Sequence, residues 1–424
     1  MSQRGSISHR LASGERPETR LPDAIEYGCG VTDVVERYLT LGLSLGRHVD
    51  GLVDSYYGPP ELAAAVNAVA PVDPAELAAH ADALAADVAG ASGIDVKRRG
   101  WLSDQIHGLG TYARVLAGES LSYADEVEQC YGVRPQLGSE AVYAEAHEQL
   151  EDLLPGDGSL HERYEAYRRE RAVEPARMVP ALRTVIALLR TRTEALVALP
   201  DGEQLVVEEV RDEPWWAFNY YQGGLRSRIV VNSDQQTTAA DLVTLAAHEA
   251  YPGHHTEHAV KEQLLVRDQG FLEESIQLVP TPQPLVSEGI AEHGLEVVMD
   301  DELERELDAA LTAHGLDGDL ARAFAIGRAR HPIRGIGLDV ALMIHEHGLS
   351  TEEARAHYER WAMSTPERSA SAVRFATDPT WRAYAVTYSA GKTLCSRYVA
   401  GDPARFRTLL TEQVRVGDLL AAGP

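Results

Sequence analysis

The sequence predicts a mainly α-helical protein with one small antiparallel sheet. Helical periodicity runs through most of the chain, with apolar residues three and four positions apart in segments such as VTDVVERYLTLGLSL, PAELAAHADALAADVAGA and YAEAHEQLEDLL. Runs of β-branched and aromatic residues occur between residues 204 and 232, where QLVVEEV, WWAFNYY and RSRIVVN are punctuated by turn residues such as QGG. Helical patterns then resume and continue toward the end of the chain, so the sheet is a small insert in a helical protein.

Three segments follow from these patterns. Residues 1–25 are polar and Arg-rich and are predicted to form a disordered arm. Residues 26–198 form a helical part, interrupted at DSYYGPPEL, where Gly-Pro-Pro predicts a turn beside Tyr56 and Tyr57. Residues 199–424 contain the small sheet, at 204–232, and the helices that carry the chemically distinctive residues.

Composition excludes several classes of function. The 424 residues include 39 Lys and Arg against 65 Asp and Glu, and the resulting net charge of -26 opposes binding to nucleic acid or to anionic membranes. No apolar run approaches the roughly 18 residues that cross a bilayer, and the first residues lack the apolar core of a signal peptide. The cysteines, Cys29, Cys130 and Cys395, form no CxxC pair, which fits a reducing cytoplasm. Nothing in these patterns indicates an oligomeric state.

The segment AAHEAYPGHHTEHA, residues 246–259, carries the strongest chemical signal. Zinc is commonly held by two histidines at positions i and i+4 of one helix, because that spacing places both rings on one face. Position i+4 from His248 is Pro252, and the next histidines are His254 and His255. On a regular helix His254 would point about 120° away from His248. Pro252 and Gly253 favour a bulge or kink, which would return His254 to the face of His248.

His255 is the competing ligand. Seven residues restore the helical face, but the axial offset from His248 would be about 10 Å, which is too long for two bonds to one ion. We therefore favour His254. A third ligand is expected from LVSEGIAEHGLEVV, where Glu288 precedes Gly289 and another backbone can approach closely. Glu292, four residues later on the same helical face, is the competing third ligand. With Glu288 as the ligand, Glu292 or His293 would support the ligands from behind.

At these residues the sequence resembles DUF885, a bacterial family of unknown function whose hallmark is similar to HEAxPGHH followed by a Ser/Thr-Glu-Gly-Trp-Ala segment. The matching segments are HEAYPGHH and SEGIAEHG, and the resemblance covers mainly residues 204–395. A late segment, VRFATDPTWRAYAVTYSAGKTL, is similar to the family's Tyr-x-x-Gly-Lys region. Ile290 stands where the family usually has Trp, and DPTWRA replaces its Pro-Gly-Gln-Ala. These departures from the family pattern bear on the choice of substrate more than on metal binding.

The resemblance implies a gluzincin- or carboxypeptidase-like fold, largely helical around a cleft, with one zinc ion held by two histidines and a glutamate. Carried onto this sequence, it implies His248, His254 and Glu288 as ligands and Glu249 as general base. Tyr388, in YAVTYSAGK, matches the family's late tyrosine and is expected to donate a hydrogen bond to an oxyanion. Further donor candidates in the last third of the chain are His331, Arg334, His345 and Arg374.

These features predict a cytoplasmic zinc metallopeptidase that cleaves a peptide or another small amide by means of a water activated by zinc and Glu249. An extended substrate is expected to pair with a sheet edge at SRIVVNSD. Two alternatives stay open: hydrolysis of a non-peptide amide or ester, and a catalytically silent metal-binding protein. A di-iron bundle is disfavoured, because none of the 16 histidines has Glu three residues before it.

Overall fold

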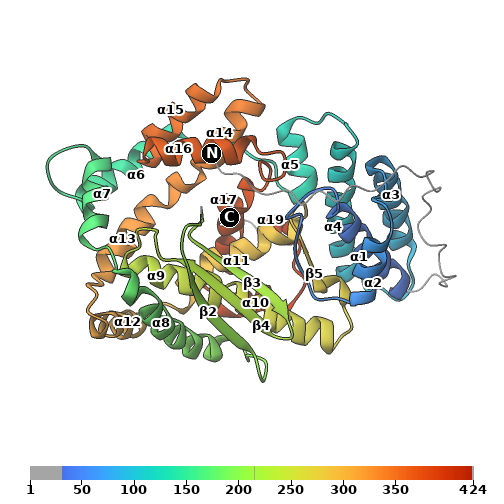
Figure 1. Cartoon of the computed structure of the whole chain (residues 1–424), viewed down its shortest axis with the longest axis horizontal. Helices are drawn as coiled ribbons and strands as arrows, with labels where there is room; N and C mark the ends of the chain where they lie inside the picture. The colour runs from blue at the N-terminus through green and yellow to red at the C-terminus, as the bar shows by residue number, and fades with distance from the viewer. Residues whose placement is uncertain (1–30, 214, 423–424) are drawn as a thin grey trace.

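The structure, a computed structural model, describes residues 31–213 and 215–422 (Figure 1). The arm predicted at residues 1–25 and Cys29 lie outside the described residues. The described part is mainly helical, as predicted. None of its helices is long and apolar enough to cross a membrane.

Eight helices and one strand precede the sheet region in the described residues. They are α1 (Val31–Leu45), β1 (Val53–Tyr56), α2 (Pro60–Ala68), α3 (Pro74–Gly90), α4 (Val96–Leu116), α5 (Tyr123–Tyr131), α6 (Glu140–Leu153), α7 (Leu160–Glu170) and α8 (Pro175–Leu196). The periodic segments quoted above fall on α1, α3 and α6, which confirms the helical prediction there. The turn at Gly58 and Pro59 is also present, but the strand that precedes it was not predicted.

The three-stranded sheet consists of β2 (Gln204–Val210), β3 (Ala217–Gly223) and β4 (Arg226–Asn232), in the order β2-β4-β3. The β3–β4 pair is antiparallel, as predicted, whereas β2 pairs in parallel with β4, so the sheet is mixed. β4 ends in the buried run Ile229–Asn232 and takes the centre, while β2 and β3 are largely exposed and form the edges. The segment predicted to offer a free edge to a substrate is therefore the central strand, and that prediction is wrong. The free edges belong to β2 and β3.

The second half of the chain returns to helices. Its elements are α9 (Ala239–Leu245), η1 (Ala246–Ala250), α10 (His254–Lys261), η2 (Glu262–Arg267), η3 (Leu272–Ser275), β5 (Ile276–Leu278), α11 (Pro282–Val298), α12 (Asp301–Ala313), α13 (Leu320–Arg330), η4 (His331–Gly335), α14 (Ile336–His345), α15 (Thr351–Ala362), α16 (Pro366–Thr377), α17 (Ala385–Val399), α18 (Pro403–Thr411) and α19 (Val416–Ala421). Strand β5 pairs with β1 in a second, antiparallel sheet of two strands.

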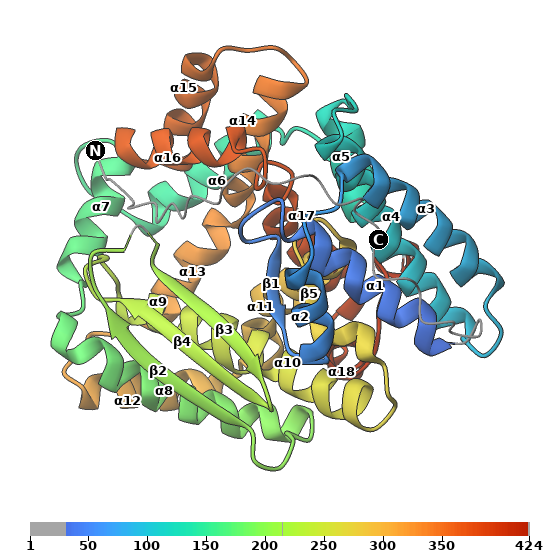
Figure 2. The same cartoon turned by 45° about the vertical axis from the view of Figure 1, so that its right-hand side comes forward.

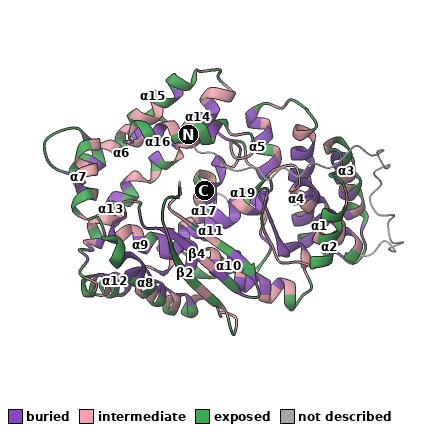
Figure 3. Cartoon of the chain, viewed as in Figure 1, coloured by how far each residue is buried: buried purple, intermediate pink, exposed green. Residues whose placement is uncertain are grey.

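Helix α11 lies at the centre of the molecule (Figures 1 and 3). Most of its residues are buried, including Leu285, Val286 and Ile290, which belong to one hydrophobic core shared with α5, α14, α17 and α18. Outer helices such as α7 expose much of their surface instead (Figure 3). Burial on several sides explains why α11 contains small residues such as Gly289 and Gly294, at which other segments pack closely.

Two further cores flank α11. One joins α8, α9, η1 and α12 beneath the three-stranded sheet, and the other joins α1, α3, α4 and β5. Figure 2 shows β1 and β5 between the three-stranded sheet and α1. Residues of η1, β5 and the first half of α11 line one cleft, and this is where the candidate site lies.

Candidate metal centre

The helix that carries His248 is broken where the sequence predicted a break. Thr238 caps α9 in a reciprocal arrangement with Asp241, and the helix continues into η1, a π-helical turn. The Tyr251 amide donates to the Ala246 carbonyl, five residues back, at 3.1 Å, and the chain then leaves the helix. A new helix, α10, begins at His254. The regular ladder therefore does not run through residues 248–256, and the predicted distortion is confirmed.

Gly253 permits the tight turn between the two helices. Its amide donates to the carbonyl of Ala247 at 2.9 Å. A Cβ at this position would lie 1.9 Å from the carbonyl oxygen of His248, which no side chain could tolerate. The turn therefore requires glycine for close approach of the backbone to itself. It also lets α10 restart at a new angle, so His254 no longer has the direction that six helical residues would give it.

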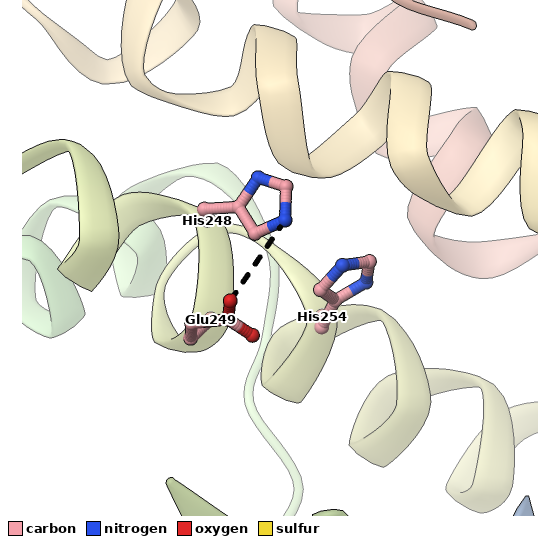
Figure 4. Close-up of side chains that lie close together, drawn as sticks. All are labelled: His248, Glu249 and His254. Atoms are coloured by element: carbon pink, nitrogen blue, oxygen red, sulfur yellow. Dashed lines mark ion pairs between the residues drawn. The ribbon is translucent and has the colours of Figure 1, made fainter. Parts of the chain in front are cut away.

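The break brings the two histidines together. Their ring centroids are 4.8 Å apart and the rings are nearly perpendicular. Figure 4 shows the side chains of His248, Glu249 and His254 approaching the same space from η1 and the start of α10. One potential ligand atom from each of the three lies within 4.8 Å of the others. Three side chains close in sequence thus form a compact cluster that could hold a metal ion.

Glu288 reaches this cluster from α11. Its carboxylate oxygens lie 3.6 Å from Nε2 of His248 and 3.9 Å from Nε2 of His254. Ligand atoms around a tetrahedral zinc ion are about 3.4 Å apart, given bonds of about 2.1 Å. Glu249 approaches Nε2 of His248 at 3.9 Å but has no oxygen within 4.0 Å of a His254 nitrogen. Of the two carboxylates, Glu288 therefore has the better position between the imidazoles.

Close helix packing holds Glu288 there. A Cβ on Gly289 would lie 2.4 Å from the sulfur of Cys395 and 2.5 Å from the carbonyl oxygen of Gly391, both in α17. The glycines let the backbones of α11 and α17 touch, as the sequence predicted for Gly289. This contact also brings Tyr384, next to the start of α17, to within a hydrogen bond of Glu288, with its hydroxyl 2.9 Å from Oε1.

The electrostatics of the cluster match a bound cation. Oε2 of Glu288 is buried and has no hydrogen-bond partner in the described residues. Burial, together with neighbouring carboxylates, raises the pKa of Glu249 to about 8 and that of Glu288 well above its ordinary value. Burial also lowers the pKa of His248 to about 4 and that of His254 to about 3. Neutral imidazoles beside an unpartnered carboxylate oxygen are the donors that a divalent ion such as zinc requires.

A hydrogen-bonded chain orients His254. Ser287 donates its hydroxyl proton to Oε2 of Glu257 at 2.6 Å, and Lys261 donates to Oε1 of the same carboxylate at 2.7 Å. Nδ1 of His254 lies 3.2 Å from the Ser287 oxygen. Because the serine proton is already used, that oxygen accepts a hydrogen from Nδ1, and Nε2 keeps its lone pair for the cluster. The side chains behind His254 thus select the tautomer that can bind a metal.

Behind His248 lies Glu292 rather than His293. Nδ1 of His248 is 3.8 Å from a carboxylate oxygen of Glu292, and Arg334 forms a two-pronged pair with that carboxylate, at 2.5 and 3.0 Å. His293 instead contacts Glu296 at 3.1 Å. Of the two residues that the sequence left open for a supporting position, Glu292 is the one placed there. Arg334, predicted as an oxyanion donor, is engaged by Glu292.

A cleft of about 860 Å³ opens above the cluster, including space continuous with solvent. His248, Glu249, His254 and Glu288 line it, together with residues from both sheets and from the start of α17. Tyr388 lines the cleft and is partly exposed to it, and its hydroxyl forms no hydrogen bond within the described residues. The remaining donor candidates are not lining residues: His331, His345 and Arg374.

Asn219 fixes the edge strand β3 against the metal-binding turn. Its side-chain amide donates to the main-chain carbonyl of Glu249 at 2.6 Å. Its own carbonyl oxygen is buried without a partner in the described residues. Ala217 and Phe218 of the same strand also line the cleft. The sequence patterns marked β3 as a strand but contained no signal that it would form a wall of the site.

His255, the competing ligand, points away from the cluster. It is completely buried, with Nδ1 2.8 Å from the hydroxyl of Ser227 and Nε2 2.7 Å from Glu203. Tyr251 and Arg190 also donate to the Glu203 carboxylate, at 2.7 and 2.8 Å. His255 therefore anchors the start of α10 to the three-stranded sheet, while its neighbour His254 faces the cleft.

The anchor makes stability depend on pH. Burial alone would raise the pKa of Glu203, but hydrogen bonds from His255, Tyr251 and Arg190 outweigh it and lower the pKa to about 2, from an ordinary value of 4.5. Ionised Glu203 therefore stabilises the fold above about pH 4.5, and this contribution is lost as the pH falls toward about 2. We expect Glu203→Gln to lower the free energy of unfolding by about 2 kcal/mol at neutral pH, and by progressively less in acid.

Urea unfolding at a series of pH values measures this difference. Glu194→Gln is the matched control, because Glu194 pairs with the same arginine, Arg190, but is exposed. Its effect should be small at every pH. A destabilisation by Glu203→Gln that does not shrink in acid would show that the carboxylate charge is not what stabilises the anchor.

Comparison with known proteins identified no relative of this chain. Scans against protein-family models, curated proteins and solved structures found no match to the chain. The resemblance to DUF885 therefore stays a prediction, and so does the gluzincin-like fold. The indication of function comes from the arrangement of His248, Glu249, His254 and Glu288 at the cleft.

Proposed function

We propose that this chain is a metal-dependent hydrolase, a zinc metallopeptidase, whose metal is held by His248, His254 and Glu288. The observation that carries the proposal is the convergence of two neutral imidazoles and an unpartnered buried carboxylate oxygen at the wall of an open cleft. Imidazole and carboxylate ligands are those of zinc peptidases, although iron, cobalt and manganese accept similar donors. A cleft beside the ligands leaves room for water and substrate.

A zinc ion bound there supplies Lewis acidity, which polarises a substrate carbonyl and acidifies water. Glu249 is not needed as a ligand if Glu288 binds, and its carboxylate lies next to the cluster, facing the cleft. We assign it the role of general base: one oxygen accepts a proton from the attacking water and later delivers it to the leaving amine. A purely structural metal site has no use for this carboxylate.

Tyr388 and strand β3 would orient the substrate. The Tyr388 hydroxyl is free to donate into the cleft, and burial together with the nearby carboxylates keeps its pKa well above the ordinary value, so the proton stays on the oxygen. That proton can stabilise an oxyanion. The free edge of β3 offers main-chain groups to an extended peptide, which supports a peptide over a compact non-peptide substrate.

The test combines elemental analysis of the purified protein with a peptide-library cleavage screen, with and without a chelator. We expect about one zinc ion per chain and cleavage that the chelator abolishes and added zinc restores. Metal without cleavage of any peptide, amide or ester would identify a silent metal-binding protein. Cleavage of amides or esters but not of peptides would reassign the substrate class. Cleavage that survives complete removal of the metal would overturn the proposal.

A further inference from the structure

Asp54 lines the cleft but has no part in the mechanism proposed above. It lies in β1, which pairs with β5 through Val53 opposite Leu278 and Ser55 opposite Gln277. The register shifts between Val53 and Ser55, so Asp54 is the extra residue of a β-bulge. Bulges redirect a side chain out of the alternation of a strand and are frequent beside active sites. Asp54 is exposed, and the surface it faces is the cleft.

The Asp54 carboxylate has no counter-charge. It forms no ion pair or hydrogen bond with any described residue, and no Lys or Arg is among the residues that line the cleft. Asp54 and Glu249 line the same cleft. A divalent metal ion would balance Glu249 and Glu288 and leave the charge of Asp54 unbalanced. The cleft therefore has a place for one more positive charge.

Neighbouring groups offer acceptors and an aromatic wall at the same place. The Gln277 side chain is 7% exposed, lines the cleft and forms no side-chain hydrogen bond within the described residues. Its strand partner, Ser55, is adjacent to Asp54 in the chain. Trp381 also lines the cleft and packs beside Gly51, three residues before Asp54, where a Cβ would lie 3.1 Å from the indole. A carboxylate, an amide oxygen and an indole face are the groups that recognise an alkylammonium ion.

We propose that Asp54, Gln277 and Trp381 form a subsite for a primary ammonium group of the substrate. The inference extends the proposed function and names its substrate class: amides and peptides that carry an alkylammonium group close to the bond that is cleaved. Two sources share this chemistry, a free peptide N-terminus and a lysine side chain. A substrate bound through a C-terminal carboxylate is disfavoured, because Asp54 and Glu249 would repel it and the lining residues offer no cation.

Binding tests the subsite separately from catalysis. Glu249→Gln protein, with its metal content measured, is titrated calorimetrically with two matched pairs of probes. The first pair is Ala-Ala-Ala-amide and its N-acetylated form. The second is acetyl-Ala-Lys-Ala-amide and the same peptide with norleucine in place of lysine. We expect the charged member of at least one pair to bind on the order of tenfold more tightly, and the pair that discriminates identifies the source of the ammonium group.

Adding Asp54→Asn should reduce that preference to less than about twofold, whereas Asp50→Asn, the same change at an exposed position of the same segment outside the cleft, should preserve it. Equal binding of charged and neutral probes, or no binding of any charged probe, overturns the subsite. So does loss of metal from Asp54→Asn, which would make Asp54 a ligand. If the preference is present but the wild-type chain cleaves nothing, the hydrolase proposal fails and the subsite stands. If the wild-type chain cleaves a substrate but shows no preference for the charged probes, the hydrolase proposal stands and the subsite fails.

Discussion

Glu249→Gln is expected to abolish hydrolysis while metal content and fold are retained. The amide has nearly the shape of the carboxylate but cannot accept a proton from water, and loss of a general base typically costs roughly a hundredfold to ten-thousandfold in rate. Glu249 hydrogen-bonds to the rest of the protein through its main-chain carbonyl, which accepts from Asn219, so the substitution leaves that contact in place. The measurement is kcat on the best substrate of the peptide screen, alongside elemental analysis and thermal unfolding.

Two readouts separate the possible roles of Glu249. A variant that loses metal together with activity would make Glu249 a ligand, in place of Glu288 or in addition to it. Glu288→Gln is the matched comparison: the same chemical change on α11 should lower the metal content first and the activity as a consequence. Turnover of Glu249→Gln equal to that of the parent chain would reassign the base.

The part of the site formed by residues 248–254 was predictable, because its ligands and the residues that break the helix are close together in the sequence. Pro252 and Gly253 cannot continue a helix, and the spacing of His248 and His254 has a use only if the helix is broken there. The structure has the predicted break at Gly253, where the backbone turns so tightly that no Cβ would fit. Glu288 was accessible to the same reasoning, since the adjacent Gly289 indicated that another helix packs closely against α11.

The rest of the site depends on contacts between distant segments. Asp54 reaches the cleft because β1 pairs with β5, more than two hundred residues later, and because one residue bulges from that pairing. A sequence pattern of period two has no means of indicating a bulge of one residue in a strand of four. Tyr384 was missed for a related reason: only the packing of α11 on α17 brings it, rather than a more conspicuous residue, to Glu288.

The strand order differs from the sequence interpretation, and the burial of α10 was not part of it. The order β2-β4-β3 depends on which strand is buried, whereas the hairpin signal at QGGL concerns β3 and β4 alone. Helix α10, HHTEHAVK, has a polar sequence typical of an exposed helix, yet His255, Glu257 and Lys261 are buried. Their burial is possible because each has a partner, and those partners come from β4, α11 and α10 itself.

The two adjacent histidines at the start of α10 divide two tasks between them. Consecutive helical side chains point about 100° apart, so when His254 faces the cleft His255 is directed toward the sheet. His254 lies beside His248 and Glu288, and His255 is held by Ser227 and Glu203. Substitution of one should therefore affect metal binding and substitution of the other should affect stability, although the residues are neighbours.

We expect His254→Ala to lose metal and His255→Ala to retain it. If a zinc binding free energy of roughly 12 kcal/mol is shared among the three protein ligands, removing one costs about 4 kcal/mol, or on the order of a thousandfold in affinity. His255→Ala should instead lower the free energy of unfolding by about 2 to 3 kcal/mol, because buried Ser227 and the ionised Glu203 each lose a hydrogen bond. Zinc affinity from competition with a chromophoric chelator and stability from urea unfolding of the metal-free proteins give the two quantities independently.

The crossed pattern is what makes this pair informative. Any disturbance at the start of α10 could weaken metal binding in a general way, but a general disturbance would affect both variants in both measurements. Because His255→Ala is expected to be the less stable of the two, its retention of metal, combined with loss of metal by His254→Ala, would show that His254 contacts the ion directly. The opposite pattern, with metal lost from His255→Ala and kept by His254→Ala, would mean that α10 rotates by about one residue when the ion binds and that the histidines exchange roles.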